Sequence, residues 1–276
     1  PFRGTSVVTI HDLSAFKWPQ CHPPERIRYM GDEVKFALQQ AALLITDSEY
    51  TRCEISRHFS WPIDKIVSVP LASAAGFHPR EAAELESCLA KHALPLNSYS
   101  LFVGTIEPRK NIEVLLDAYE RLPASLRQRW PLVLTGYEGW NSVEIHDRLA
   151  SAERAGWLRY LGFVDSEDLP LIYAGARLFV FPSLYEGFGL PVLEAMASGI
   201  PVVCSNASSL PEVAGNAALM CEAQDVVKLT QLIQRGLEDG DWRASASSLG
   251  LSKAAEFTWA RCARQTANAY EKALQN

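Results

Sequence analysis

One segment carries the clearest structural signal in the chain: Leu178-Phe-Val-Phe-Pro-Ser-Leu-Tyr-Glu-Gly-Phe-Gly-Leu-Pro-Val-Leu-Glu-Ala195. Its first four residues are apolar without alternation, which is typical of a strand buried on both faces of a parallel sheet. Gly187 and Gly189 then permit a tight loop, and Pro191 suits the first position of a helix. The segment therefore predicts a strand, a loop and a helix in succession, which is the repeating unit of an α/β sheet.

The same rhythm of short apolar runs and amphipathic stretches extends through nearly the whole chain. We expect strands at Val7–Ile10, Leu43–Thr46, Ile66–Val69, Ser100–Val103, Pro131–Thr135, Leu158–Leu161, Leu178–Phe181 and Pro201–Cys204. We expect helices at Asp32–Leu44, Ser48–His58, Asn111–Leu122, Ser142–Ala155, Glu167–Ala174, Pro191–Ser198, Asp225–Leu237 and Thr258–Leu274. This alternation predicts the α/β class, with Rossmann-like, doubly wound parallel sheets joined by right-handed crossovers.

With 276 residues the chain is long enough for about two domains. A linker of small residues at Leu71–Gly76 leads us to place the boundary near residue 78. We expect a partial Rossmann-like domain at 1–78, a complete one at 79–257, and a last helix at 258–276 that packs back toward the first part. Because the first part has only about three strands, we expect that domain to be truncated.

Composition excludes several classes of protein. The balance of 26 basic against 32 acidic residues gives a net charge of −6, without the basic excess of a nucleic-acid binder. The six cysteines are far apart and form no CxxC pair, so they indicate neither a disulfide scaffold nor a zinc ribbon. No apolar run reaches the roughly 18 residues that a membrane span requires. We therefore expect a cytoplasmic location.

A first candidate site is the loop Gly104-Thr-Ile-Glu-Pro-Arg-Lys-Asn111, which follows an expected strand and precedes an expected helix. Ligands of doubly wound sheets bind beyond the carboxyl ends of the strands, where this loop lies. Arg109 and Lys110 beside a helix N-terminus form an anion site that is suited to a diphosphate. The alternative is a solvated pair of surface cations.

The second candidate site is the loop after Phe181. The backbone N–H groups of Phe188, Gly189 and Leu190 can point at a phosphate, although the loop matches neither GxGxxG nor a P-loop. Glu194 can accept two hydrogen bonds from a vicinal diol such as a ribose, and Glu186 can bind hydroxyl groups of a second sugar. The alternative for Glu194 is a capping or dipole role.

Two further features give weaker evidence of a functional site. His11 follows the first expected strand and can hydrogen-bond a ligand lying between the domains. The alternative is that His11 has only a structural role. The Asp239-Gly-Asp241 sequence lies between two helical stretches. It indicates a polar loop rather than a metal site.

Taken in order, His11-Asp12, Glu107-Pro-Arg-Lys-Asn111 and Glu186-x7-Glu194 closely resemble the family-4 retaining glycosyltransferases of the GT-B fold. The resemblance covers nearly the whole chain and extends to Leu161-Gly-Phe-Val164, Ala197-x-Gly-Ile-Pro-Val202 and Ser208-Ser-Leu-Pro-Glu-Val213. One departure is Thr105, where many members carry an arginine. The first loop is similar to that of bacterial mannosyl- and related transferases of surface polysaccharides, which hints at GDP-mannose as the donor.

The resemblance implies a role for each matching position. Arg109 and Lys110 bind the diphosphate of the donor, and Glu194 binds its ribose. Glu186 and His11 contact the transferred sugar. The catalytic set implied is His11, Arg109, Lys110 and Glu186. The donor-binding set implied is Arg109, Lys110, Val164, Glu186, Gly187, Phe188, Gly189, Leu190 and Glu194, with backbone near Val164 at the base.

The activity implied is retaining transfer of a hexose, mannose favoured, from a nucleotide diphosphate sugar to a saccharide or lipid-linked acceptor in polysaccharide biosynthesis. No metal or other cofactor is expected, because the protein supplies the positive charge. Peripheral association with the cytoplasmic face of the membrane is left open. Two alternatives remain. One is a non-catalytic nucleotide-sugar-binding remnant, suggested by the incomplete first domain. The other is a glycoside hydrolase with Glu186 and Glu194 as its acid/base pair, which leaves the Arg-Lys loop without a task.

Overall fold

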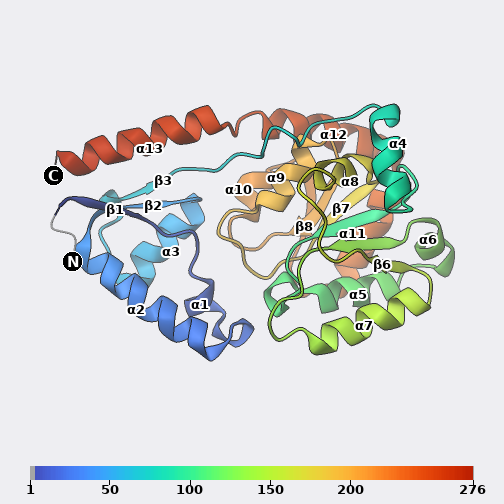
Figure 1. The fold of residues 1–276 in the computed structure, drawn as a ribbon, viewed down its shortest axis with the longest axis horizontal. Helices are drawn as coiled ribbons and strands as arrows, with labels where there is room; N and C mark the ends of the chain where they lie inside the picture. Colours follow the sequence, from blue (N-terminus) through green and yellow to red (C-terminus); the bar gives the residue numbers. More distant parts are fainter. Residues whose placement is uncertain (1–3, 276) are drawn as a thin grey trace.

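The computed structural model describes residues 4–275 and places two parallel β-sheets in them (Figure 1). The first sheet has the order β1-β2-β3 and consists of Ser6–Thr9, Ala41–Thr46 and Ile66–Ser68. The second has the order β6-β5-β4-β7-β8-β9 and consists, in chain order from β4 to β9, of Ser100–Val103, Leu132–Thr135, Leu158–Tyr160, Leu178–Phe181, Val202–Ser205 and Ala218–Cys221. Every strand pair in these sheets is parallel, so the predicted α/β class is confirmed.

The first sheet is flanked by α1 (Ser14–Lys17), η1 (Pro19–Cys21), α2 (Pro24–Gln40), α3 (Glu49–Phe59) and η2 (Ile63–Lys65). Helix α3 begins where the Ser48 hydroxyl accepts a hydrogen bond from the Thr51 N–H, as an N-cap does. Helix α2 has a proline at its start, and it begins well before the predicted Asp32. The predicted helix end at Leu44 was wrong, because β2 begins directly after Gln40 and takes the apolar run that follows.

Helices cover both faces of the second sheet (Figure 1). One layer contains α5 (Ile112–Glu120), α7 (Val143–Arg154) and α11 (Val226–Glu238), and α5 contacts each of the other two. The other contains α4 (Ala82–Lys91), α8 (Leu169–Gly175), α9 (Leu190–Ala197), α10 (Leu210–Ala214) and α12 (Gly240–Ala254). The short η3 (Pro108–Lys110) and α6 (Ala124–Arg129) complete the elements of this part.

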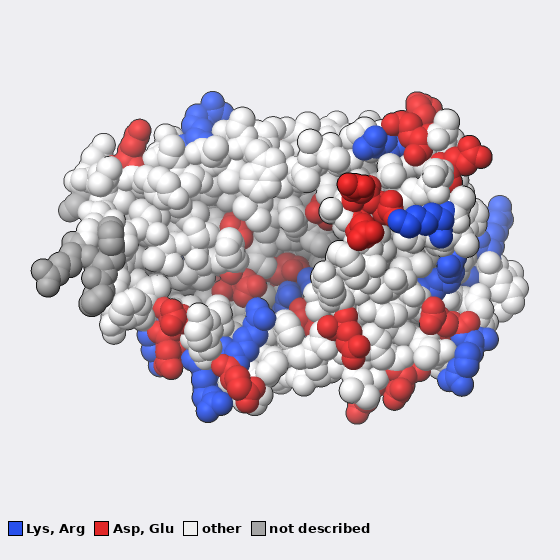
Figure 2. Space-filling model, in the orientation of Figure 1, with Lys and Arg blue, Asp and Glu red and all other residues white. Residues whose placement is uncertain are grey.

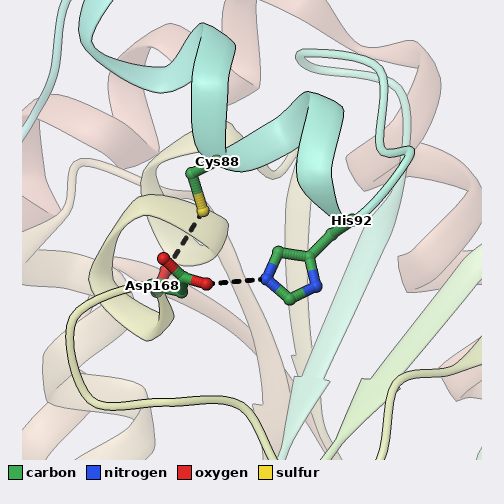
Figure 3. A group of neighbouring side chains, drawn as sticks. All are labelled: Cys88, His92 and Asp168. Atoms are coloured by element: carbon green, nitrogen blue, oxygen red, sulfur yellow. Dashed lines mark hydrogen bonds and ion pairs between the residues drawn. The ribbon is translucent and has the colours of Figure 1, made fainter.

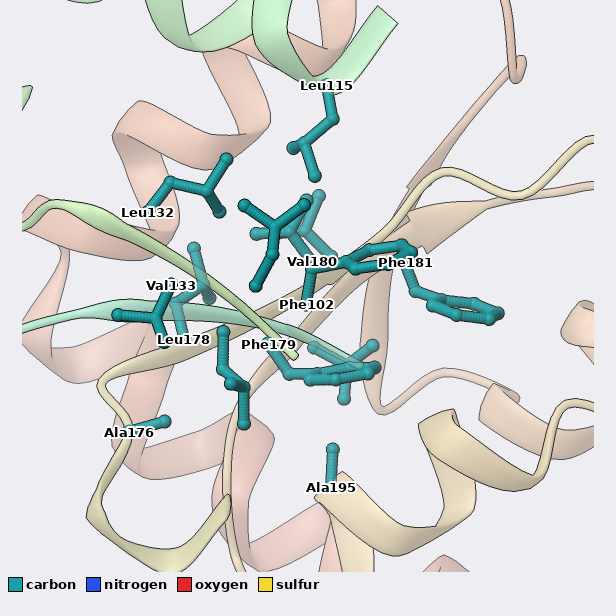
Figure 4. Close-up of a cluster of buried hydrophobic side chains, with 14 of the residues drawn as sticks. Phe102, Leu115, Leu132, Val133, Ala176, Leu178, Phe179, Val180, Phe181 and Ala195 are labelled. Carbon is teal, nitrogen blue, oxygen red and sulfur yellow. The ribbon is translucent and has the colours of Figure 1, made fainter. Parts of the chain in front are cut away.

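The main hydrophobic core is centred on β7. All four of its residues, Leu178 to Phe181, are fully buried. Figure 4 shows Leu115 of α5 on one side of the strands and Ala195 of α9 on the other. Burial on both faces explains why the strand reads as an unbroken apolar run rather than an alternating one.

The predicted ranges omitted helices α4, α6, α10 and α12 and strand β9 of this part. Strand β9 is a short run at the sheet edge, and its residues are mostly half-buried. Helix α12 lacks a stripe of large apolar residues, and the residues that it buries are Ala246, Gly250 and Ala254. A Cβ built on Gly250 would lie 3.3 Å from the Met196 side chain, so small residues let α12 pack closely on α9.

The chain ends in α13 (Trp259–Leu274), which is capped by the Thr258 hydroxyl and returns to the first sheet (Figure 1). Its Ala269 and Ala273 pack in one buried cluster with Leu43 and Ile45 of β2. The predicted boundaries serve below as names: the N-terminal part is residues 4–78 and the C-terminal part is residues 79–257. Those boundaries, and the truncation of the first domain, stay predictions. No helix among residues 4–275 combines the length and apolar character needed to cross a bilayer.

Candidate functional site

The topology of the second sheet brings the two candidate loops together. Strands β4 and β7 are neighbours, although β5 and β6 lie between them in the chain. A crevice opens at the carboxyl ends of two such strands, where the strand order reverses, and ligands of doubly wound sheets bind there. The loops are joined directly by hydrogen bonds from the Leu184 N–H to the Arg109 carbonyl (2.9 Å) and from the Arg109 guanidinium to the Tyr185 carbonyl (2.6 Å).

A compact cluster of charges lies at this junction. Nζ of Lys110 is 2.6 Å from Oε1 of Glu186, and a guanidinium nitrogen of Arg109 is 3.2 Å from Oε2 of the same carboxylate. A second guanidinium nitrogen is 2.7 Å from Glu107. All four side chains are at least seven-eighths buried. The two cations predicted from the sequence therefore do lie at the glycine loop, but two carboxylates balance their charge.

The cluster shifts the ionisation of its members. Burial opposes the charged form of Glu186, yet Lys110 and Arg109 outweigh burial and hold the pKa of this carboxyl below its usual value. Burial dominates at Glu107 and raises its pKa. Glu186 is thus an anion at neutral pH, and each of its two carboxylate oxygens contacts a cation. Hydroxyl groups around it complete the arrangement, since Ser183 donates to Oε1 and Ser208 accepts from the Glu186 N–H.

The helix that follows begins at the expected place. Gly189 is the N-cap of α9 and has a φ of 107°, a conformation that favours glycine. Gly187 has a different constraint: a Cβ at this position would lie 2.1 Å from the carbonyl oxygen of His11. The close backbone approach at Gly187 is therefore made to the N-terminal part of the protein itself. Phe188 packs into the core edge-on against Phe257.

Glu194 lies one turn into α9 and apart from the charge cluster. Its carboxylate accepts a hydrogen bond from the Tyr173 hydroxyl at 3.1 Å and makes no helix-cap bond, which removes the capping alternative. Burial raises the pKa of Glu194 to about 7. Such a carboxyl gains from any ligand that donates hydrogen bonds to its ionised form.

Two aromatic side chains near Val164 were not singled out in the sequence. Val164 itself is buried. Tyr137 and Phe163 stack with their ring centroids 4.6 Å apart, and each ring is more than half exposed. They follow β5 and β6 at the same edge of the sheet as the charge cluster. An exposed aromatic pair at a ligand-binding edge was the signal that sequence reasoning overlooked.

His11 lies beside Gly187, at the interface of the two parts. Its Nδ1 is 2.7 Å from Asp47, which follows β2, while the side chain is 71% exposed. The hydrogen bond to Asp47 is the main reason that the pKa of His11 is raised. The carboxylate orients the ring, and most of the ring remains accessible.

Polar contacts join the two parts around this point. The Tyr185 hydroxyl contacts the Glu54 carboxylate and accepts from the Leu13 N–H at 3.1 Å. Glu212 accepts hydrogen bonds from the N–H groups of Glu49 and Tyr50 at the start of α3. Figure 2 shows a hollow between the two halves, with acidic and basic side chains on its floor. The site is therefore a cleft lined by both parts of the chain.

A group of possible metal ligands lies elsewhere, between α4 and α8 (Figure 3). Asp168 accepts hydrogen bonds from His92 at 2.9 Å and from Lys91 at 2.7 Å, and Cys88 lies against its backbone carbonyl at 3.8 Å. Burial raises the pKa of the Cys88 thiol to about 11. Because the thiol is protonated and Lys91 already balances the carboxylate, the group acts as a polar link between the two helices.

Comparisons with known proteins agree with this geometry. Residues 91–253 match the family described as Glycosyl transferases group 1. The chain is 47% identical over 266 residues to O-antigen chain mannosyltransferase B of Escherichia coli, covering 96% of this chain and 70% of that protein. It is 34% identical over 258 residues to the serotype-specific mannosyltransferase WbdA of Escherichia coli, of which it spans 31%.

Solved structures show the same fold. HepE of Anabaena, in complex with UDP and glucose, superposes with a TM-score of 0.83 at 19% identity, covering 98% of this chain and 72% of that one. WaaG, a glycosyltransferase involved in lipopolysaccharide biosynthesis, gives a TM-score of 0.77 at 17% identity, covering 96% and 74%. The molecule is thus a glycosyltransferase with the GT-B fold. The chain belongs to the group 1 glycosyl transferases, which confirms the resemblance seen in the motifs.

Proposed function

We propose that this protein transfers mannose from GDP-mannose to a saccharide or lipid-linked acceptor, with retention of anomeric configuration. The observation that carries the proposal is the meeting of Arg109, Lys110 and Glu186 at the start of α9. The preference for mannose rests on the similarity to O-antigen chain mannosyltransferase B. The preference for GDP-mannose as the donor rests on the first loop, which is similar to that of bacterial mannosyltransferases.

In this proposal the main chemical task is to stabilise the leaving diphosphate. Breaking the bond between sugar and phosphate builds negative charge on the diphosphate and positive charge on the sugar ring. Arg109, Lys110 and the N–H groups at Gly189 and Leu190 are the groups that bind the diphosphate. The protein supplies this positive charge itself, so turnover needs no metal, and we expect it to survive addition of EDTA.

The remaining roles follow from position. Glu186 binds hydroxyl groups of the transferred sugar, and His11 approaches that sugar from the N-terminal part. Glu194 accepts hydrogen bonds from the ribose diol, and backbone near Val164 meets the base. Glu194→Ala should therefore weaken binding of GDP more than that of its 2′,3′-dideoxy analogue. Equal losses for the two ligands would remove the diol assignment.

A glycoside hydrolase is disfavoured by the same geometry. Such an enzyme needs one carboxyl group as an acid and the other as a nucleophile or base at the bond that breaks. Lys110 and Arg109 already engage both oxygens of Glu186. The hydrolase reading also leaves those two buried cations without a task.

The proposal is tested by calorimetry and by a transfer assay on the chain as it stands. GDP-mannose should bind more tightly than UDP-glucose or UDP-N-acetylglucosamine. Mannose should then appear on a mannose-terminated oligosaccharide in the α configuration of the donor. Donor binding without transfer would instead identify a nucleotide-sugar-binding remnant, and no binding of any of the three donors would overturn the proposal. Flotation of the protein with vesicles that carry a lipid-linked acceptor would test association at a membrane face.

A further inference from the structure

Residues 208–213 lead from the loop after β8 into α10, and they contact both parts of the protein. Within the C-terminal part they bind the glycine loop, defined here as residues 182–189. The buried Ser209 hydroxyl lies within hydrogen-bond distance of the carbonyl oxygens of Glu186 (2.9 Å) and Phe188 (2.8 Å). The Ser208 hydroxyl accepts a hydrogen bond from the Glu186 N–H at 2.7 Å. The segment is therefore fixed to the backbone of the glycine loop.

Glu212 extends from the same segment to the N-terminal part. Its Oε2 accepts a hydrogen bond from the Glu49 N–H at 2.9 Å, and its Oε1 accepts one from the Tyr50 N–H at 2.6 Å. Glu49 and Tyr50 are the first two residues of α3. The first N–H groups of a helix have no partner inside the helix, and the positive end of the helix dipole favours a carboxylate. One carboxylate of the C-terminal part therefore caps a helix of the N-terminal part with both of its oxygens.

The residues beside this cap contact the glycine loop. The hydroxyl oxygens of Ser48 and Thr51 lie 2.6 Å and 3.2 Å from the carbonyl oxygen of Gly187. Both side chains are buried, and Ser48 is also the N-cap of α3. The start of α3 is thus held by the C-terminal part at two points, at Glu212 through its backbone and at Gly187 through its side chains.

The same start of α3 orients His11. Asp47 directly precedes the N-cap and is buried, and its carboxylate lies 2.7 Å from Nδ1 of His11. The hydrogen bond to Asp47 is the main reason that the pKa of His11 is raised, and the charges of Asp47 and Asp12 act in the same direction. A displacement of residues 47–51 would therefore move the carboxylate that orients the His11 ring.

We propose that Glu212 is a positioning residue for sugar transfer. By binding the first two N–H groups of α3, it holds residues 47–51 against the glycine loop and keeps the His11 ring directed at the transferred sugar. The inference rests on the proposed function, because the role of His11 at the sugar belongs to that proposal. It also gives residues 208–213 a task, since their serines fix the glycine loop and their glutamate places the opposing histidine.

The first test compares donor binding with turnover. Glu212→Ala removes both hydrogen bonds to α3, whereas Glu212→Asp keeps a carboxylate there. Arg109, Lys110 and Glu194, which are proposed to bind the nucleotide, all belong to the C-terminal part. We therefore expect Glu212→Ala to bind GDP within twofold of the wild type while kcat with GDP-mannose falls at least fivefold. Glu212→Asp should recover part of the lost kcat.

The second test measures the pKa of His11 by NMR of the histidine ring protons, without donor or acceptor. His11→Gln identifies the signal of this ring. Asp47→Asn gives the pKa of His11 without its carboxylate partner, and Glu212→Ala should shift the pKa toward that lower value. Glu144 is an exposed acid in the first turn of α7, within the C-terminal part, so Glu144→Ala is the matched control and should change neither kcat nor this pKa.

A purely structural role would give a different pattern. If Glu212→Ala lowered GDP affinity and kcat by the same factor, or left kcat unchanged, the inference would be overturned. A loss of kcat with an unchanged His11 pKa would overturn it as well, because the effect would then not pass through His11. A wild-type protein that transfers no mannose would contradict the proposed function alone, since the His11 titration tests the positioning without turnover. The two failures are therefore distinguishable.

Discussion

The ammonium group of Lys110 lies 2.6 Å from Oε1 of Glu186, although the two residues are 76 positions apart in the chain. The contact is possible because β4 and β7 are adjacent at the point where the strand order reverses. Glu186 keeps Lys110 and Arg109 in place at the start of α9. A ligand with a diphosphate would meet cations that are already positioned, and would compete with Glu186 for them.

Replacing Lys110 should weaken both nucleotide binding and the fold. Lys110→Met removes a cation from the predicted diphosphate site and leaves Glu186 with Arg109 alone. Loss of one partner of a buried ion pair costs about 3–5 kcal/mol, and we expect the lower end because Arg109 remains. Calorimetry with GDP and urea unfolding measure the two effects. The exposed Lys35 provides the control Lys35→Met. Unchanged affinity for GDP would count against the diphosphate assignment.

Replacing Glu186 should separate nucleotide binding from turnover. Glu186→Gln keeps the shape of the side chain but removes the charge that competes for Lys110 and Arg109. We expect GDP to bind at least as tightly as in the wild type, while transfer from GDP-mannose falls at least tenfold. Comparison of GDP affinity with kcat checks this. A wild-type kcat, or a loss of GDP affinity as large as that of Lys110→Met, would reject the role of Glu186 at the sugar.

Glu194 should make stability depend on pH near neutrality. Its folded-state pKa is raised from 4.5 to about 7, so the folded protein holds the proton more tightly than the unfolded chain. The resulting stability is fully present below about pH 4.5 and is lost as the pH rises through 7; a shift of this size corresponds to about 3 kcal/mol. Glu194→Gln cannot ionise and should not show this loss. Urea unfolding of both proteins from pH 4 to 8 checks the prediction, and parallel stability curves would contradict it.

Adding a methyl group at Gly187 should disturb the contact between the two parts. A Cβ there would lie 2.1 Å from the His11 carbonyl oxygen and 2.9 Å from Cβ of Asp12. We expect Gly187→Ala to lower the melting temperature and to reduce kcat at least tenfold. Gly31 in α2 has nothing within 4 Å of a built Cβ, so Gly31→Ala should instead stabilise the protein by about 0.5–1 kcal/mol. Equal changes in melting temperature and kcat for Gly187→Ala and Gly31→Ala would show that the close approach at Gly187 is unimportant.

The sequence predicted most of the fold because the core strands are short and wholly apolar. The run at Leu178–Phe181 leaves little choice of structure, and its flanking loop and Pro191 indicate the helix that follows. Helix α12 escaped prediction because it buries small residues such as Ala246 and Gly250, which form no apolar stripe. Strand β9 was not predicted because a half-buried edge strand has only a weak hydrophobic pattern. Where burial is partial or made by small side chains, hydrophobic periodicity carries little information.

The sequence by itself determined the α/β class and the two loops that follow buried strands, together with the motifs of a glycosyltransferase. These features are local, since apolar runs, glycines, prolines and charges act on neighbouring residues. Only the tertiary structure decided that Glu186 balances Lys110 and Arg109 and that Gly187 touches His11. Those contacts depend on strand order and on the packing of the two parts, which bring together residues that local interactions leave far apart.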